Sequence, residues 1–343
     1  MKACVFLGER QLEIRDYPDP TSGPDEVVVA IKASGMCGTD LHHYRGPKRR
    51  EDQIVIEGHE PCGVVAAVGS AVRQREAKVG DRVMVHHYDG CRTCHYCRSG
   101  WTQMCASEVK VTFGGLDADG AHAKFMKVPA HTLIKMPRNL SFKAGAAIAC
   151  GTGTAYGAIK RIALSGDETV AIFGQGPVGL SCTMFAKATG ARVIALDVGE
   201  ERLEMARRFG ADLLINPLKD DPVAAIRDAT RRGEGADKSI ECSSNPLARR
   251  QSIEAIRRWG TACLVGVFGT MEFDVTEVIQ RQKTLLGSIT FSKNLQDDCA
   301  QYVVERGLDV DALFTHEFVL DQAEEAYRLF DTQKIGKGVF LFD

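Results

Sequence analysis

The sequence predicts a two-domain protein of α/β and β class, in which a mainly β, barrel-like region accompanies a doubly wound parallel sheet. Short β-like runs divided by Gly, Pro and Asp fill the chain to about residue 135, whereas strand-like and helix-like segments alternate from about residue 167. The length of 343 residues also exceeds what one ordinary compact core contains. Two domains are therefore expected.

The first domain is expected to begin with a hairpin within residues 1–17, MKACVFLGERQLEIRDY. Four β-like runs follow, EVVVAIKAS, CGVVAAVGS, DRVMVHHY and HAKFMKVPA. The chain ends with two helical stretches, LQDDCAQYVVERG and QAEEAYRLFDTQ, and two β-like runs, LFTHEFVL and KGVFLFD. Because a last strand with no following helix suits a β domain, we expect residues 292–343 to complete the first domain, residues 1–153.

The second domain, residues 154–291, is expected to contain repeated βα units. The strand-like segments are TVAIF, RVIALD, DLLIN, DKSIEC and TACLVGV, and the region ends near LLGSIT. The helices between them are PVGLSCTMFAKATG, GEERLEMARRFG, DPVAAIRDATRRG and one helix over residues 246–260. Repeated βα units predict a parallel, doubly wound sheet.

Composition excludes several classes of partner. A net charge of −2 implies no surface for nucleic acid, and no apolar run is long enough for a membrane-spanning helix. The start, MKACVFLGERQLEIRDY, carries charges every few residues and is no secretory signal. Twelve cysteines without such a signal indicate a reducing, cytoplasmic location, where clustered thiols are more often metal ligands than disulfides.

A glycine motif, G-x-G-x-x-G, directly follows the strand-like run TVAIF and opens a helix. Gly174 can make the tight turn, Gly176 lets the backbone approach a pyrophosphate, and Gly179 lets helix and strand pack closely. Pro177 and Val178 lie between the last two glycines, at a helix N-terminus that would face the phosphates. In this context the motif predicts a dinucleotide site.

An acidic residue, Asp197, closes the next strand-like run, RVIALD. Its carboxylate can accept hydrogen bonds from both hydroxyls of an adenosine ribose and would repel a 2′-phosphate, which favours NAD over NADP. Arg202 and Arg192 lie nearby and weaken that preference. The alternative is an aspartate that merely caps the end of the strand.

Four cysteines in a turn-rich lobe, residues 91–105, have the spacing C-x2-C-x2-C-x7-C. Cys91, Cys94, Cys97 and Cys105 can surround one zinc ion with four thiolates and leave no open position, as in a structural site. An iron–sulfur cluster is the main alternative, but no proline follows the last cysteine. The spacing therefore favours a structural zinc.

A second, dispersed set offers a thiolate, an imidazole and another thiolate, from Cys37, His59 and Cys150. Three protein ligands leave one position for water or substrate, as a Lewis-acid zinc requires. Glu60, beside the histidine, can bind transiently while ligands exchange.

With these motifs in order, the whole chain resembles the zinc-dependent medium-chain alcohol dehydrogenases. The matching segments are Cys37-Gly-Thr-Asp, Gly58-His-Glu, the cysteine lobe, Cys150-Gly-Thr-Gly-Thr, the glycine motif and Asp197. The resemblance implies a GroES-like β-barrel catalytic domain interrupted by a Rossmann domain that binds NAD. It also implies two zinc ions per chain, a catalytic one at Cys37, His59 and Cys150 and a structural one in the lobe.

The resemblance also implies roles for residues beside the first ligand. Thr39 is similar to the residue that takes the hydroxyl proton, and His42 to the histidine that passes it to solvent. Asp40 is similar to the carboxylate that orients the zinc-binding histidine. In the alternative interpretation, Thr39 and Asp40 cap a helix through LHHYRG, and either His42 or the adjacent His43 is a surface residue.

Five further residues resemble positions at the cofactor. Thr154 is similar to a residue that packs against the nicotinamide. The stretches that contain Val265, Gly266, Ser288 and Thr290 resemble the wall around its carboxamide.

The expected function is oxidation of a primary or secondary alcohol to an aldehyde or ketone, by hydride transfer from a zinc-bound alkoxide to NAD. His87 falls where related enzymes carry an aromatic residue in the alcohol pocket, so we hypothesise a polar pocket for a secondary alcohol, diol or polyol. A threonine or polyol dehydrogenase of the sorbitol type is an alternative, and a non-catalytic protein that binds zinc and NAD is a remote one. The expected partner is a small-molecule alcohol, and the family suggests a homotetramer or homodimer.

Overall fold

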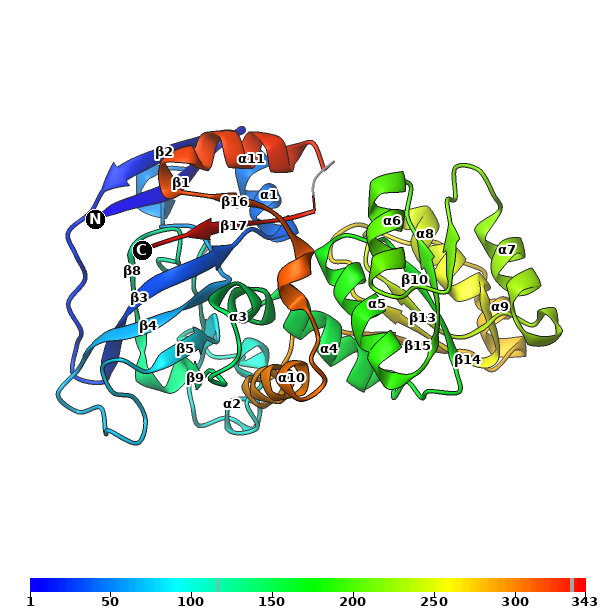
Figure 1. Ribbon diagram of the computed structural model, residues 1–343, viewed down its shortest axis with the longest axis horizontal. Coiled ribbons are helices and arrows are strands. Elements are labelled where there is room, and N and C mark those ends of the chain that lie inside the picture. The colour runs from blue at the N-terminus through cyan, green and yellow to red at the C-terminus, as the bar shows by residue number, and fades with distance from the viewer. Residues whose placement is uncertain (116, 334–335) are drawn as a thin grey trace. The chain divides into compact units, whose positions relative to one another are not determined.

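The protein is described here by a computed structural model that covers residues 1–115, 117–333 and 336–343, and the chain divides into two compact units. The first unit contains Met1–Gly153 and Phe291–Asp343, and the second contains Thr154–Thr290 (Figure 1). Phe291 belongs to the first unit, one residue before the boundary expected from the sequence. Among the described residues, no helix is long and apolar enough to cross a membrane.

The first unit is built on a seven-stranded, mostly antiparallel sheet with the order β16-β17-β3-β4-β5-β9, in which β8 also pairs with β3. The expected hairpin is present as a separate pair, β1 with β2, and a short pair joins β6 to β7. The strands are β1 (Lys2–Gly8), β2 (Gln11–Asp16), β3 (Glu26–Gly35), β4 (Pro61–Val68), β5 (Arg82–Val85), β6 (Tyr88–Asp89), β7 (Val111–Thr112), β8 (Phe125–Pro129), β9 (Leu133–Lys135), β16 (Phe314–Phe318) and β17 (Lys337–Leu341).

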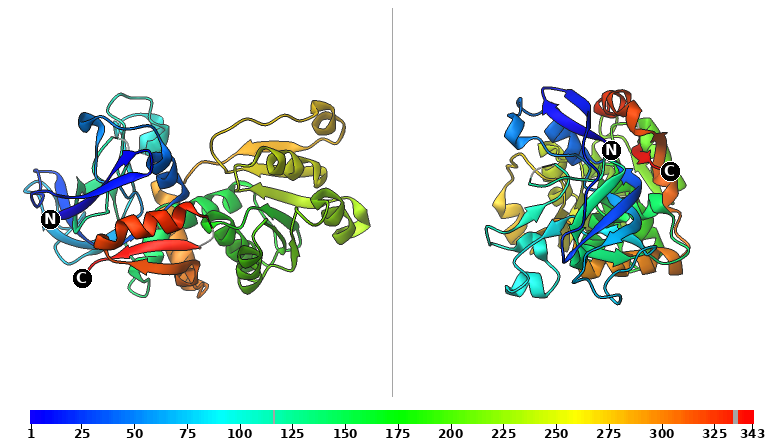
Figure 2. Two further views of the ribbon diagram at one scale, coloured as in Figure 1. Left: turned by 90° about the horizontal axis from the view of Figure 1, so that it is seen from above. Right: turned by 90° about the vertical axis from the view of Figure 1, so that its left-hand side faces the viewer.

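Short helices connect these strands, and both chain ends lie in this unit (Figure 2). The α-helices are α1 (Gly38–Arg45), α2 (His95–Arg98), α3 (Phe142–Ile148), α10 (Lys293–Glu305) and α11 (Ala323–Asp331). The single 3-10 turns are η1 (Glu51–Gln53), η2 (Thr102–Met104), η3 (Ala130–Thr132), η5 (Val310–Leu313) and η6 (Leu320–Gln322).

Two apolar clusters hold the first unit together. Alternate residues of β3, Val27, Val29 and Ile31, are buried against side chains of β4, β5 and β8, as expected for a strand with period-two patterning. In the second cluster, aromatic side chains of β1, α1, α11 and β17 pack together, and the rings of Phe6 and Tyr327 meet edge to face with centroids 4.6 Å apart. The tail therefore belongs to this core.

The second unit has one parallel sheet of six strands with the order β12-β11-β10-β13-β14-β15. The strand order reverses between β10 and β13, which is the point where doubly wound sheets bind ligands. Its elements are α4 (Gly151–Arg161), which starts in the first unit, β10 (Thr169–Phe173), α5 (Pro177–Thr189), β11 (Arg192–Leu196), α6 (Glu200–Arg208), β12 (Leu213–Ile215), α7 (Pro222–Ala229), η4 (Arg231–Gly233), β13 (Ala236–Glu241), α8 (Pro246–Glu254), β14 (Ile256–Leu264), α9 (Val275–Gln280) and β15 (Thr284–Gly287).

The expectation of one helix over residues 246–260 is wrong. Helix α8 ends at Glu254, and β14 begins at Ile256, which pairs with Ala236 of β13. Ile256 is buried with its neighbours on α8 and β14, and Trp259 adopts a positive φ of 61° that no helix accepts. Pairing with the sheet therefore overrides the helical pattern of this segment.

Candidate active site and metal centres

The first group of candidate residues gathers around the start of α1, directly after β3. Cys37 is the N-cap of α1, and Oδ2 of Asp40 accepts a hydrogen bond of 2.8 Å from the Cys37 backbone N–H. The other oxygen of Asp40, Oδ1, lies 2.9 Å from Nδ1 of His59. Asp40 therefore caps the helix and contacts the histidine at the same time.

Four potential metal ligands converge here, because the Sγ, ring nitrogen and carboxylate atoms of Cys37, His59, Glu60 and Cys150 all lie within 4.8 Å of one another. The two sulfur atoms are 3.9 Å apart. The residues come from the ends of β3 and α3 and from the segment before β4. His59, Glu60 and Cys150 are buried, and Cys37 is partly buried.

The protonation of this group is set by its close contacts. The pKa of the Cys37 thiol lies well below its usual value, because the Cys150 thiol hydrogen-bonds to its sulfur and the His59 ring is close. Burial opposes the charged form of His59, but Asp40 and Cys37 raise its pKa well above the usual value. Burial likewise disfavours an anionic Asp40, yet His59 keeps the pKa of that carboxyl below its usual range.

The donor set fits a zinc ion with one open position. Two thiolates and an imidazole are ligands that zinc prefers, and a tetrahedral site with three protein ligands keeps one place for water or substrate. Among the described residues, Oε1 of the buried Glu60 has no hydrogen-bond partner, so it is an unpaired oxygen next to the three ligands.

Thr39 and His42 both lie on α1, after Cys37. Thr39 is partly buried, whereas His42 is exposed. The adjacent His43 is turned elsewhere, since its Nδ1 lies 3.3 Å from Oε2 of the buried Glu57. The two neighbouring histidines are thus distinguished by their surroundings.

His87 is buried beside His59, and the centroids of the two rings are 5.3 Å apart. Its Nδ1 lies 3.0 Å from the carbonyl oxygen of Ala149, which can only accept, so Nδ1 carries the hydrogen. Burial, with help from His59, holds the pKa of His87 well below its usual value. The ring is therefore neutral, and its Nε2 is a hydrogen-bond acceptor.

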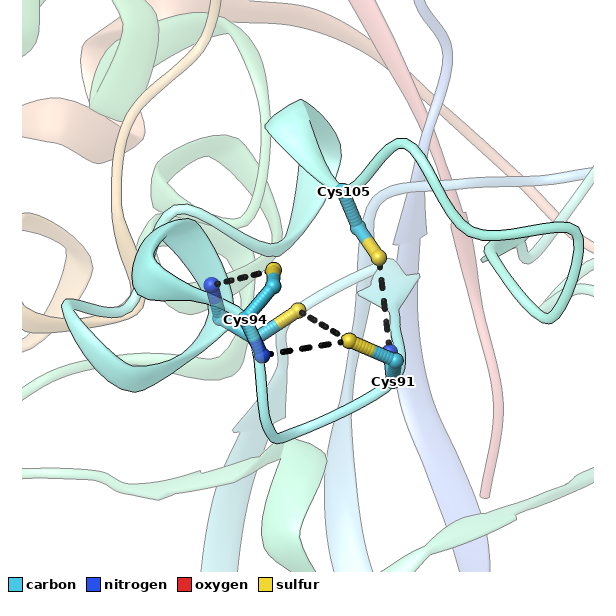
Figure 3. A group of neighbouring side chains, drawn as sticks. Cys91, Cys94 and Cys105 are labelled. Atoms are coloured by element: carbon cyan, nitrogen blue, oxygen red, sulfur yellow. Dashed lines mark hydrogen bonds between the residues drawn. The ribbon is translucent and has the colours of Figure 1, made fainter.

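The four cysteines of the lobe also come together, with all four sulfur atoms within 4.8 Å of one another (Figure 3). Backbone N–H groups of Cys94 and Cys97 donate to the sulfurs of Cys91 and Cys94, at 3.3 and 3.4 Å. The Thr93 hydroxyl and the backbone N–H groups of Cys94 and Thr93 lower the pKa of the Cys91 thiol to about 6. Burial raises the pKa of the Cys97 thiol to about 12, so these contacts favour a thiolate at Cys91 in particular.

The glycine motif occupies the turn from β10 into α5. Gly174 has a φ of +89°, and a Cβ on Gly179 would lie 1.8 Å from the Gly174 carbonyl oxygen, so both positions require glycine. Gly176 is the N-cap of α5 and has open space where a Cβ would point. Pro177 and Val178 form the first turn of α5.

Asp197 directly follows β11 and is buried. Its two carboxylate oxygens accept hydrogen bonds from the backbone N–H groups of Gln175, at 2.7 Å, and Gly199, at 2.8 Å. Arg202 approaches Oδ2 to 3.9 Å. Each oxygen keeps a lone pair, so the residue combines the structural role with the capacity to accept further donors.

The remaining candidates of the second unit lie at the ends of β14 and β15 and in α4. Thr154 is in the first turn and a half of α4. Val265 and Gly266 donate their N–H groups to the carbonyl of Glu241, while Ser288 donates to Leu264. The structure gives Thr290 a positive φ of 49°.

Buried Arg249 is a residue of the second unit that the sequence did not single out. Its guanidinium donates to the carbonyl oxygens of Gly266, Phe268 and Thr270 and lies 3.5 Å from Glu241. It fixes the loop after β14, which contains two of the candidate cofactor residues. No local spacing in the sequence marks it.

Comparison with known proteins agrees with this geometry. The profile of an alcohol dehydrogenase GroES-like domain matches residues 23–138, and that of a zinc-binding dehydrogenase matches residues 177–306. An uncharacterized zinc-type alcohol dehydrogenase-like protein, YphC of Escherichia coli strain K12, is 35% identical over 100% of this chain and 99% of its own length. The chain belongs to the zinc-type alcohol dehydrogenase family.

Other relatives of this dehydrogenase differ in their substrates. An L-threonine 3-dehydrogenase of Symbiobacterium thermophilum is 34% identical, and the match covers 96% of this chain and 94% of that protein. The solved structure of alcohol dehydrogenase TADH from Thermus sp. ATN1 superposes with a TM-score of 0.91 at 28% identity and covers 99% of both chains. Membership in this family implies that the protein is an oxidoreductase, which uses zinc and a nicotinamide cofactor and acts on a small-molecule alcohol.

The dehydrogenase has one charged residue at the first site that sequence reasoning missed, Lys337 at the start of β17. Its Nζ donates to the Met36 carbonyl at 3.1 Å and lies 2.5 Å from Oε2 of Glu60. Both charged side chains are almost fully buried. Burial outweighs the effect of Lys337 and raises the pKa of Glu60 to about 8.

Glu60 also needs a glycine opposite it, because a Cβ on Gly35 would lie 1.9 Å from its Oε2. Gly35 ends β3, which pairs with β17. The antiparallel pairing of β3 and β17 therefore places two residues beside Glu60. Gly35 leaves room for its carboxyl group, and Lys337 provides a positive charge next to it.

Replacing Lys337 with Met should destabilise the protein by about 3–5 kcal/mol above pH 8, where Glu60 is ionised and would be left buried without its counter-charge. Urea unfolding of the metal-free protein measures this change. In the matched double variant, Lys337→Met with Glu60→Gln, most of the loss should be recovered. Equal destabilisation of the single and double variants would show that the ion pair does not matter.

Proposed function

We propose that this dehydrogenase oxidises a primary or secondary alcohol to an aldehyde or ketone at a catalytic zinc site formed by Cys37, His59 and Cys150, with NAD as hydride acceptor. The convergence of these ligand atoms with Glu60 within 4.8 Å carries the proposal. When bound, zinc lowers the pKa of a coordinated hydroxyl, as it does for water, and so favours the alkoxide that donates hydride. A second, structural zinc is assigned to the cysteine lobe.

The chain's own residues handle the proton. Thr39, two residues after Cys37, is assigned as the acceptor of the substrate hydroxyl proton, and the exposed His42 one turn later as the group that passes it to solvent. Asp40 keeps His59 in the orientation and tautomer that a zinc ligand needs. Glu60 remains available as an alternate ligand.

The two metal sites can be separated by matched cysteine variants. Cys150→Ala should lose one of two zinc ions and all alcohol-dependent reduction of NAD, while it still binds NADH. Cys94→Ser should lose the other zinc and lower the melting temperature, because structural zinc contributes directly to folding. Zinc content and absorbance at 340 nm measure both effects.

Cys299→Ala, at a buried cysteine outside both groups, is the control and should keep two zinc ions per chain. A wild-type protein with a single zinc, or an active Cys150→Ala variant, is incompatible with the assignment. A non-catalytic protein that binds zinc and NAD would in turn show full metal content and no turnover with any alcohol.

The substrate pocket is proposed to be polar, which favours a secondary alcohol, diol or polyol. The support is the neutral, buried His87 ring, whose Nε2 can accept a hydrogen bond from a second substrate hydroxyl. Relatives that act on threonine, together with a reductase of D-xylulose, keep the threonine and polyol alternatives open.

His87→Phe should lower the ratio of kcat/KM for 2,3-butanediol to that for 2-butanol by roughly fivefold to tenfold, the effect of one lost neutral hydrogen bond. The same change at the adjacent His86 is the control, because both ring nitrogens of His86 already contact protein atoms, Gln296 Oε1 at 3.0 Å and Thr102 Oγ1 at 3.1 Å. If both variants leave the ratio as in the wild type, His87 does not select the substrate.

NAD is proposed as the cofactor in preference to NADP. Asp197 at the end of β11 supports this choice, since its carboxylate can accept ribose hydroxyls and repels a 2′-phosphate. Gly174, Gly176 and Gly179, with Pro177 and Val178, are assigned to the pyrophosphate. The other assigned cofactor residues are Thr154, Arg202, Val265, Gly266, Ser288 and Thr290.

Asp197→Ala should reduce kcat/KM for NAD by roughly tenfold to a hundredfold, as expected for lost hydrogen bonds to a charged group, and should leave NADP turnover equal or higher. Asp212→Ala is a matched control, because Asp212 also accepts a backbone N–H, from Val193 at 2.7 Å, at the opposite end of β11. A NAD to NADP preference that changes equally in both variants would argue for a purely structural Asp197.

Residues 1–153 and 291–343 are proposed as the catalytic domain and residues 154–290 as the NAD-binding domain of a cytoplasmic homodimer or homotetramer. The cytoplasm suits six thiol ligands, which a reducing compartment protects. Strand β15 forms one edge of its sheet, and the side chains of Trp259, Ile279 and Ile289 nearby are exposed. An apolar edge of this kind favours association with a second copy.

A further inference from the structure

Behind the proposed zinc ligand His59, a line of polar side chains crosses the core of the first unit. Ser34 Oγ lies 2.7 Å from His122 Nδ1, and His122 Nε2 lies 2.6 Å from the Tyr327 hydroxyl. That hydroxyl donates to Asp40 Oδ2 at 3.0 Å, and the other oxygen of Asp40 lies 2.9 Å from His59 Nδ1. Ser34, His122, Tyr327 and Asp40 are fully buried.

The hydrogens in this line can have only one arrangement. A carboxylate only accepts, so Tyr327 must give its single hydrogen to Asp40. Its oxygen then accepts the Nε2–H of His122, and Nδ1 of His122 accepts the hydroxyl of Ser34. Burial lowers the pKa of His122 to about 4, so the ring is neutral and has only one N–H to give. Every donor therefore points toward Asp40.

Burying this line of polar side chains costs more free energy than burying apolar side chains of the same size. Tyr327 and His122 lie among aromatic rings, including Phe6 and Phe340, where two phenylalanines would fill similar space without polar atoms to satisfy. His122 also lies against Gly58, the neighbour of His59, where a Cβ would come within 2.4 Å of its Nδ1. Such a fit indicates a built arrangement around the ligand.

We propose that Tyr327 and His122 are positioning residues that hold Asp40 in one orientation and thereby fix the ring orientation and tautomer of His59 for zinc. The inference rests on the proposed function of His59 as a zinc ligand. With the hydrogen on Nδ1, which lies 2.9 Å from Asp40 Oδ1, Nε2 of His59 keeps the lone pair that a metal requires. Helix α11 thus supports the metal site from the C-terminal part of the chain.

Tyr327→Phe tests this, because it removes one oxygen and keeps the ring in place. Zinc release from the catalytic site should be about tenfold faster, the lower end of the effect of lost outer contacts on metal affinity. The release is measured as transfer of zinc to a chromophoric chelator, which should occur in two phases, one for each site. The phase that is missing in Cys150→Ala is assigned to the catalytic site. The lobe phase should not change.

Tyr44→Phe is the matched control, since Tyr44 packs on the same rings, with its centroid 5.7 Å from that of Tyr327, and its hydroxyl has no hydrogen bond to Asp40 among those described. It should leave both release phases unchanged. At the other position, His122→Gln can retain an N–H toward Tyr327 and should release zinc nearly as slowly as the wild type. His122→Phe cannot, and should resemble Tyr327→Phe.

A double-mutant comparison shows whether the hydroxyl acts through Asp40. In an Asp40→Asn background, Tyr327→Phe should add less than twofold to the release rate, because their shared contact is already altered. Two results would overturn the inference. One is that the effects of the two substitutions on the zinc-release rate add fully, and the other is that Tyr327→Phe releases catalytic zinc as slowly as Tyr44→Phe. A wild-type protein with no catalytic zinc phase would instead refute the proposed function, before any variant is compared.

Discussion

The first unit depends on burying two pairs of ionisable side chains in an apolar interior. Asp40 and His59 form one pair, Lys337 and Glu60 the other, and no side chain among them is more than 7% exposed. An unpaired charge at this depth is strongly unfavourable, so each needs its partner at close range. Because the partners are far apart in sequence, these pairs constrain the path of the chain around the proposed metal site.

The C-terminal tail meets much of this constraint. Strand β17 pairs antiparallel with β3, with Val339 opposite Gly35, and so carries Lys337 to Glu60. Helix α11 brings the Tyr327 hydroxyl to Asp40. The C-terminal tail therefore supplies the partners of two buried carboxyl groups, Glu60 and Asp40, in the first unit.

Local sequence predicted the features that depend on local geometry. The four-cysteine lobe and the glycine turn at Gly174 were evident because their spacing and conformation follow from neighbouring residues. Lys337, Tyr327 and His122 were not predicted, because their partners lie 88 to 301 residues away and no periodicity marks them. The error at Ile256 has the same origin, since a long-range strand pairing decided its conformation.

Asp40 shows why a structural and a functional interpretation of one residue need not compete. As the third residue of α1, its Oδ2 accepts the Cys37 N–H, which aligns the carboxylate with the helix. That alignment leaves Oδ1 for His59, so the helix cap itself sets the direction of the second contact. Asp197 repeats the principle, because backbone N–H groups hold both of its oxygens while each retains a lone pair. In both cases the local hydrogen bonds orient the carboxylate that we assign to a ligand, so removing the backbone contact would disturb the site as much as removing the charge.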